Sequence, residues 1–152
     1  MTSKLKVQPE RIELSGRDGR RQTFTGVLLG SGSSRSEVHS DHLGDYAARG
    51  TKCSACRWFE VAIYARIHDR DTGLYPTVKD YVVHTVGGSV VPREKRFSRI
   101  QTTTSPYDVI ELVTVRPVDR EPFIASQSAR ALAQAADVDD GIRDAYINRA
   151  VV

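Results

Sequence analysis

The sequence predicts an α+β fold in which an antiparallel β-sheet of about six short strands precedes two C-terminal helices. Short segments that alternate apolar and polar residues recur between turn residues up to about residue 116, as in antiparallel sheets. Residues 123–152 instead space their apolar side chains as a helix does. We therefore expect residues 1–122 to form a β domain and residues 123–152 to form a helical hairpin on it, in a single domain overall.

The first strands are expected as a hairpin. Arg11–Leu14 and Gln22–Leu29 alternate in polarity, and Ser15–Arg20 supplies the turn between them. Gly30–Ser36 is small and polar, so we expect a mobile surface loop there. A phosphate-binding loop is the alternative, but the lysine of a Walker motif is missing.

The segment Trp58–His68 shows the clearest strand pattern. Its apolar residues alternate on one face, which we expect to belong to the core: Phe59, Val61, Ile63, Ala65 and Ile67. The opposite face mixes aromatic and charged groups, and we expect it to face solvent or a partner: Trp58, Glu60, Ala62, Tyr64, Arg66 and His68.

Three more strands are expected farther along the chain. Thr77–Val86 is followed by Gly87–Gly88, a pair typical of a tight two-residue hairpin. Phe97–Thr104 is a weaker strand, and Tyr107–Arg116 is a strong one because Val, Ile and Leu occur throughout it.

The C-terminal segment predicts two helices. Ser126–Ala136 is rich in alanine, and Ser126 or Ser128 is suited to cap its N-terminus. The second helix starts at Asp139–Asp140, and Ile142, Ala145 and Tyr146 form its apolar stripe. We expect this hairpin to cover one face of the sheet; an arm that docks on another subunit is the alternative.

Two histidines and two cysteines within eighteen residues form the most specific motif. The order is H-x-x-H, ten residues, then C-x-x-C, from the residues His39, His42, Cys53 and Cys56. Thiolates and imidazoles are the preferred ligands of tetrahedral zinc. We therefore predict a structural Zn²⁺ site that clasps the loop of residues 36–51 to the strand that starts at Trp58. Such a closed site contributes folding free energy on the order of 10 kcal/mol and leaves no position for an activated water.

Other interpretations of the motif stay open. Asp41, Asp45 or His68 is able to replace one histidine as a ligand, or the chain binds no metal. Redox catalysis is less well supported, because a strand and not a helix is expected after C-x-x-C.

A small metal-dependent hydrolase is a further alternative. His68 and His84, on expected strand faces beside Glu60 and Asp108, are residue types that serve as general acids and bases. Nothing in the spacing of these four residues requires them to cluster, so the sequence favours a non-enzymatic protein.

Composition limits the compartment and the partners. The 152 residues are 39% hydrophobic and 27% charged, with a net charge of +3. No apolar run approaches the roughly 20 residues that span a bilayer, so no membrane association is expected. No hydrophobic stretch follows the N-terminal charges as in a signal peptide, so a cytoplasmic location is expected.

A nucleic-acid partner is the main alternative to a protein partner. The cationic residues are 17 Arg and 5 Lys, and arginine forks match phosphate geometry, although a GC-rich genome also favours arginine codons. The expected surface combines stacking aromatics with arginines: Arg57, Trp58, Tyr64, Arg66, Arg93, Arg96 and Arg99.

Two stretches carry a resemblance. Gly50–Glu60 and Ser105–Leu112 make residues 39–116 resemble small uncharacterised proteins of actinobacterial phages. The resemblance implies a phage source, and hence the cytoplasm of the host, but no activity. The leading expectation is a non-enzymatic, zinc-stabilised binding protein that acts on a host or phage macromolecule as an inhibitor or accessory factor; its oligomeric state stays open.

Overall fold

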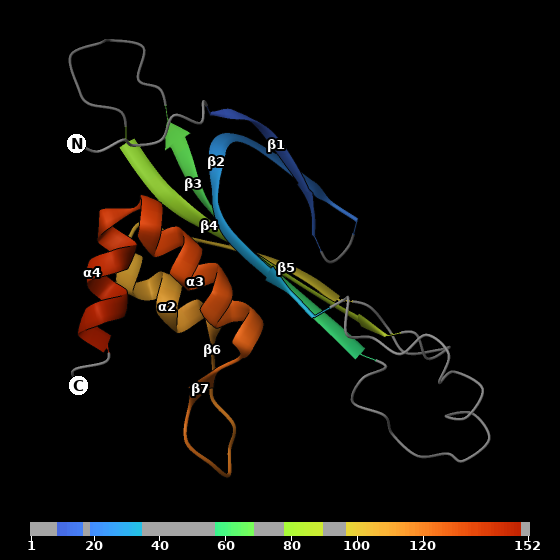
Figure 1. The fold of residues 1–152 in the computed structure, drawn as a ribbon. Coiled ribbons are helices and arrows are strands. Elements are labelled where there is room, and N and C mark those ends of the chain that lie inside the picture. The colour runs from blue at the N-terminus through green and yellow to red at the C-terminus, as the bar shows by residue number, and fades with distance from the viewer. Residues whose placement is uncertain (1–8, 17–18, 35–56, 69–77, 90–96, 150–152) are drawn as a thin grey trace.

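A five-stranded antiparallel sheet and a layer of helices make up the fold (Figure 1). The computed structural model describes residues 9–16, 19–34, 57–68, 78–89 and 97–149. The sheet follows chain order, with the strands β1 (Glu10–Ser15), β2 (Arg21–Ser33), β3 (Arg57–His68), β4 (Val78–Ser89) and β5 (Phe97–Thr103). The helices are α2 (Pro106–Val113), α3 (Ser126–Val138) and α4 (Asp140–Arg149).

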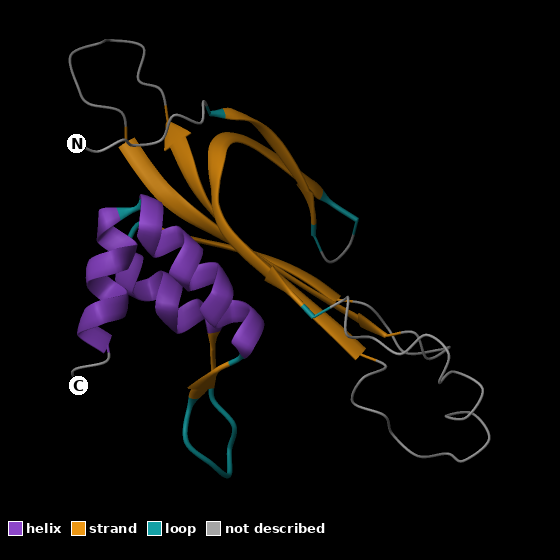
Figure 2. Ribbon diagram, in the orientation of Figure 1, coloured by secondary structure: helices purple, strands orange, loops and turns teal. Residues whose placement is uncertain are grey.

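A small second sheet joins α2 to α3. It pairs β6 (Thr114–Val115) with β7 (Phe123–Ile124), and the loop between them projects from the helices (Figure 2). The predicted α+β class with an antiparallel sheet is confirmed, although the described residues contain five sheet strands, this extra pair and three helices. The expected boundary between the β domain and the helical hairpin, at residue 122, would separate β6 from its partner strand β7. Within the described residues, no helix has both the length and the apolar character needed to cross a membrane.

The main core lies between the sheet and the helices. Val61, Ile63 and Ala65 of β3 are buried on the face predicted from their alternation. The helices contribute Leu132 from α3 and Ile142 from α4, both fully buried. The expected helical hairpin on one sheet face is therefore present, with α3 and α4 in nearly the predicted ranges.

The predicted strand Tyr107–Arg116 is wrong, because most of it is α2. Ser105 caps the helix by accepting from the Tyr107 N–H at 3.2 Å, and Pro106 occupies the first turn, where its missing N–H has no cost. Val109, Ile110 and Val113 are buried. Their spacing fits one face of a helix, and an apolar run of this kind does not by itself distinguish a strand from a helix.

The predicted loop Gly30–Ser36 is also wrong in its first part, because β2 continues to Ser33. Gly30 and Gly32 lie against the backbone of α3, and a Cβ on either one would collide with a helix carbonyl, that of Ala131 or that of Gln127. The glycines therefore serve close packing of strand and helix. The remainder, residues 35–36, lies outside the described residues.

Helix α3 also covers an otherwise open strand edge. β1 pairs with β2 only as far as Gly26, so the later part of β2 has no neighbouring strand on that side among the described residues. The Ser31 N–H donates to Gln134 Oε1 at 3.0 Å, and Arg130 Nη1 donates to the Ser33 carbonyl at 3.4 Å. Helix side chains thus satisfy backbone groups that would otherwise invite edge pairing.

The second face of the sheet is partly closed by its own curl. Leu14, Trp58 and Val82 lie on that face and are 7%, 7% and 1% exposed. Ser98 of β5 donates its hydroxyl to the Ser15 carbonyl of β1 at 2.6 Å, so the two outer strands meet. The expectation that this face is open to solvent or a partner therefore does not hold for its buried residues.

The predicted hairpin at Gly87–Gly88 is wrong as well. Both glycines lie inside β4, paired with Phe59 and Trp58. A Cβ at Gly88 would collide with the Trp58 indole. The glycine therefore makes room for a buried ring and does not form a turn.

A buried carboxylate joins the two C-terminal helices to the sheet. Asp139 is 4% exposed, ends α3 and accepts the Ile142 N–H of α4 at 3.0 Å. It also accepts the Tyr81 hydroxyl at 3.0 Å. Burial, followed by the Asp139 charge, raises the pKa of Tyr81, so the phenol keeps its proton. The predicted serine cap of α3 is not present: its N-cap is Ala125, without a side-chain hydrogen bond.

We predict that Gly32→Ala destabilises the protein by about 1–3 kcal/mol, the usual cost of overpacking. The added methyl meets the α3 backbone, which cannot move aside as a flexible side chain does. Urea unfolding followed by circular dichroism measures the change. Ser31→Ala is the control, since Ser31 uses its backbone N–H toward α3; equal stability losses in both variants would contradict the packing role.

Candidate functional site

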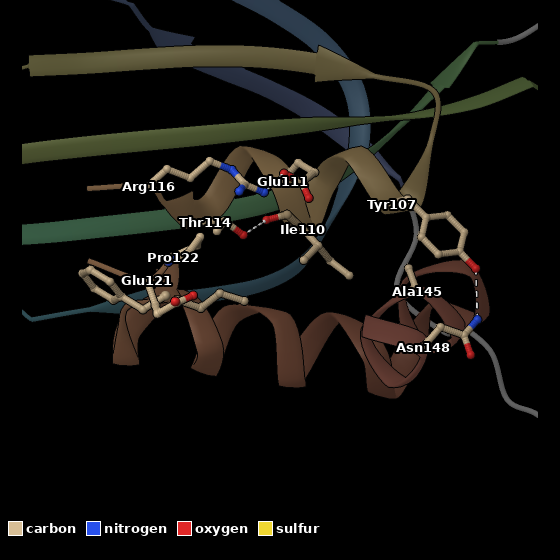
Figure 3. A pocket seen from close by; sticks show the side chains of 11 residues that line it. Tyr107, Ile110, Glu111, Thr114, Arg116, Glu121, Pro122, Ala145 and Asn148 are labelled. Atoms are coloured by element: carbon tan, nitrogen blue, oxygen red, sulfur yellow. Dashed lines mark hydrogen bonds and ion pairs between the residues drawn. The ribbon is translucent and has the colours of Figure 1, made fainter. Parts of the chain in front are cut away.

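A groove of about 690 Å³ lies between α2, α4 and the β6–β7 hairpin (Figure 3). Tyr107 and Asn148 stand at one end, where the Asn148 amide donates to the Tyr107 hydroxyl at 3.0 Å. Glu121 stands toward the other end. Ile110 and Ala145 also line the groove and belong to the buried core, so one wall is rigid. The volume lies in the range of ordinary ligand and peptide pockets.

The local sequence explains why the groove forms. After Val113 the chain turns extended, and the Thr114 hydroxyl donates back to the Ile110 carbonyl at 2.7 Å. Thr114 then pairs with Ile124, which brings the returning chain beside α2. The hairpin therefore forms one wall, and the two helices form the others.

Most of the exposed large apolar side chains belong to the elements that form the groove. Eight large apolar residues are exposed among the described residues, and five belong to α2, the hairpin and α4: Tyr107, Val115, Val118, Phe123 and Ile147. Val118 is fully exposed in the hairpin loop, and Ile147 is 56% exposed on α4. These elements form the walls of the groove, and exposed apolar side chains beside a groove are typical of interaction sites.

The charges at the groove are mostly acidic once ion pairs are considered. Arg116 is paired with Glu111, and the Arg120 guanidinium lies 4.9 Å above the Phe123 ring. Glu121 and Asp144 form no ion pair with another described residue. Arg116 and Arg120 are therefore engaged, whereas the lining carboxylate Glu121 forms no ion pair with another described residue.

A second concave region, about 370 Å³, lies at β2, β3 and β4. Glu60 and His84 line it together, as the acid–base hypothesis requires, and the Ser33 hydroxyl donates to Glu60 Oε2 at 3.1 Å. Asp108 is elsewhere, on α2, where it accepts the Thr103 hydroxyl at 3.1 Å. The structure therefore assembles only part of the proposed acid–base cluster.

Proton positions argue against a serine nucleophile in this pocket. His84 Nε2 lies 2.9 Å from Ser98 Oγ, which resembles a serine–histidine pair. However, Ser98 donates its single hydroxyl proton to the Ser15 carbonyl, so Nε2 must carry a proton and donate to Oγ. The imidazole therefore supports strand closure and does not activate the serine.

The predicted zinc ligands and two of the predicted arginines fall outside the described residues. These are His39, His42, Cys53 and Cys56 for the metal, and Arg93 and Arg96 for nucleic acid. Among the described residues there is no group of three or more potential metal ligands.

The remaining predicted nucleic-acid residues are not brought together on one open surface. Trp58 is buried, and Tyr64 is half-buried with its ring edge-on to Phe24. Arg66 is held by Asp80 through two hydrogen bonds of 2.9 and 2.7 Å. Arg99 is exposed but points to the opposite face of the sheet from these three, and Arg57 is the first residue of β3. Stacking on Trp58 would require it to leave the core.

No protein-family model, curated protein or solved structure matches this chain. The groove is therefore interpreted from its own geometry and chemistry.

Sequence reasoning did not find the groove residues. Treating Tyr107–Arg116 as a strand placed neighbouring residues on opposite faces and so dispersed them. The signal that was available is Ser105–Pro106, a cap followed by a first-turn proline, ahead of an apolar stripe. A helix there would have placed Tyr107, Ile110, Glu111 and Thr114 along one side.

We predict that His84 makes stability fall in mild acid. Burial lowers the pKa of His84 below its ordinary value of 6.5, so the unfolded chain takes up this proton more readily than the native protein. The stabilisation is complete above about pH 6.5 and is lost as the pH falls from there toward the lower native pKa. Urea unfolding from pH 8 to 5 should show a smaller loss for His84→Gln, which can still donate to Ser98. Identical pH profiles would refute the assignment.

Proposed function

We propose that this protein is a non-enzymatic, zinc-stabilised binding module that holds a partner protein in the groove between α2, α4 and the β6–β7 hairpin. The observation that carries the proposal is that five of the eight exposed large apolar residues among the described residues belong to the three elements that form that groove. Monomeric proteins seldom leave such surface uncovered without an interaction.

The extent of the apolar surface favours a macromolecule over a small ligand. Tyr107 and Phe123 line the groove, whereas Val115, Val118 and Ile147 lie outside its lining. A small molecule that filled the groove would leave these three side chains in water. A partner protein is able to cover both the groove and its surroundings.

The hydrolase alternative has weaker support. Its candidate pair, Glu60 and His84, lies in a pocket where Ser98 is not activated. The groove, in turn, is lined by carboxylates and one ion-paired arginine, with no histidine, cysteine or activated hydroxyl.

The zinc part of the proposal rests on the motif and on where its connection begins and ends. Residues 35–56, which include His39, His42, Cys53 and Cys56, join two adjacent antiparallel strands. At their edge the Phe59 N–H donates to Ser34 Oγ at 2.9 Å and the Ser34 N–H donates to the Phe59 carbonyl at 2.9 Å. Connections longer than about 12–15 residues without structure of their own are uncommon in compact domains, and a four-ligand zinc clasp would supply such structure.

The resemblance to actinobacterial phage proteins sets the proposed context. An accessory factor or inhibitor made during infection would need a binding surface and no active site, as proposed for the groove. The partner would then be a host or phage protein in the host cytoplasm.

We predict that the purified protein carries one zinc ion per chain and that Cys53→Ser/Cys56→Ser removes it. Because a structural zinc contributes on the order of 10 kcal/mol, the variant should melt far below the native protein. Elemental analysis and thermal unfolding with and without a chelator measure both effects. A metal-free native protein, or an unchanged melting temperature in the variant, would refute the zinc clasp while leaving the groove untouched.

We predict that a photo-crosslinking amino acid at position 147 captures a partner in cells that express the protein. The control is the same amino acid at position 28, because Leu28 and Ile147 are similarly exposed, 50% and 56%, on different layers. Adding Phe123→Ser should weaken the crosslink from position 147. Equal capture from both positions, or capture that ignores Phe123→Ser, would show that the groove is not the binding surface.

Nucleic-acid binding stays the second candidate, because residues 1–105 hold 17 Lys and Arg against 11 Asp and Glu. A gel-shift assay with single- and double-stranded DNA and RNA at low salt tests it directly. Binding that weakens steeply with salt would favour this candidate.

A further inference from the structure

We propose that the groove takes a short peptide segment in which apolar side chains alternate with lysine or arginine. This inference rests on the proposed function and specifies the chemistry of the partner. It follows from three features of the groove: its length, its apolar lining residues and its charge.

The length of the groove suits a short segment. From Tyr107 to Thr114 the α2 wall rises about 10 Å, at about 1.5 Å per residue. That length accommodates two helical turns or three to four extended residues of a partner. Tyr107 and Asn148 bound one end (Figure 3), and Phe123 of the hairpin, 39% exposed, offers a second apolar contact. The rings of Tyr107 and Phe123, together with Ile110 between the helices, are suited to contact apolar side chains of the ligand.

The charge around the groove favours cationic side chains at the remaining positions of the peptide ligand. Residues 106–152 hold five Arg against eight Asp and Glu, a net charge of −3. Arg116 is paired with Glu111, and Arg143 donates to Asp140 and to the last carbonyls of α3. Asp144, one turn before the groove residue Asn148, and Glu121 in the lining are therefore available to attract a basic partner.

The same charges disfavour a second copy of this chain as the occupant. A two-fold dimer places the same patch of both subunits face to face. It would set the acidic groove against itself, with Glu121 and Asp144 of the two copies in one contact. Like charges opposed in this way cost binding free energy.

Peptide binding to the full-length protein tests the inference. The probes are two fluorescent ten-residue peptides, one alternating Leu or Phe with Lys or Arg, and one with Glu at the basic positions. The basic peptide should bind, more weakly in high salt, and the acidic peptide should not. Glu121→Gln/Asp144→Asn should weaken binding of the basic peptide about two- to thirtyfold, since two exposed ion pairs together contribute about 0.4–2 kcal/mol. Asp137→Asn is the matched control, an exposed carboxylate on α3.

The outcomes separate this inference from the proposed function. Equal binding of both peptides, or no effect of Glu121→Gln/Asp144→Asn beyond that of Asp137→Asn, overturns the basic-peptide inference. So does a dimer seen by light scattering that Ile147→Ser dissociates. If neither peptide binds while position 147 still captures a partner, the inference fails and the binding function stands. Circular dichroism of each variant verifies that the fold is intact.

Discussion

The packing of α3 against the open edge of β2 is the contact on which the rest of the arrangement depends. Gly30 and Gly32 allow the helix backbone to approach the strand, and Arg130 and Gln134 then bond the strand groups that lack a neighbouring strand. This contact fixes α3, and the buried Asp139 at its end fixes the start of α4 against Tyr81 of β4. The position of the groove between α2 and α4 therefore depends on Gly30 and Gly32 of β2, which allow α3 to pack closely and so fix where α4 begins.

The two faces of the sheet are covered in different ways, and this difference affects where apolar side chains stay exposed. One face is partly closed by the curl that brings Ser98 to Ser15, and the other is covered by the helices. His84, the candidate acid–base residue of the pocket at β2, β3 and β4, is hydrogen-bonded to Ser98 as part of this strand closure. Among the described residues, five of the eight exposed large apolar side chains belong to α2, the β6–β7 hairpin and α4.

Local patterns predicted the parts of the fold that depend on local chemistry. The alternation in Trp58–His68 and the spacing of Ile142 and Ala145 each identified the correct core face, because burial acts on one element at a time. The errors arose where tertiary contacts decide. Gly30–Ser33 resembles a loop until a helix backbone lies against it, and Gly88 resembles a turn until the Trp58 ring is placed. Likewise, the composition of the Trp58 face does not reveal that the sheet curls over it.

The candidate site shows the same division. A metal motif can be recognised from spacing because its ligands lie within one loop, whereas a groove made by three separate elements has no spacing of its own. Ile147 is nevertheless a residue whose position in the sequence points to the groove. Helix α4 buries Ile142 and Ala145 against the core, yet Ile147 is 56% exposed. A helix that covers only a core needs one apolar stripe. Ile147 lies off that stripe and precedes the groove residue Asn148, so it is the α4 side chain on which the proposed partner is expected to pack.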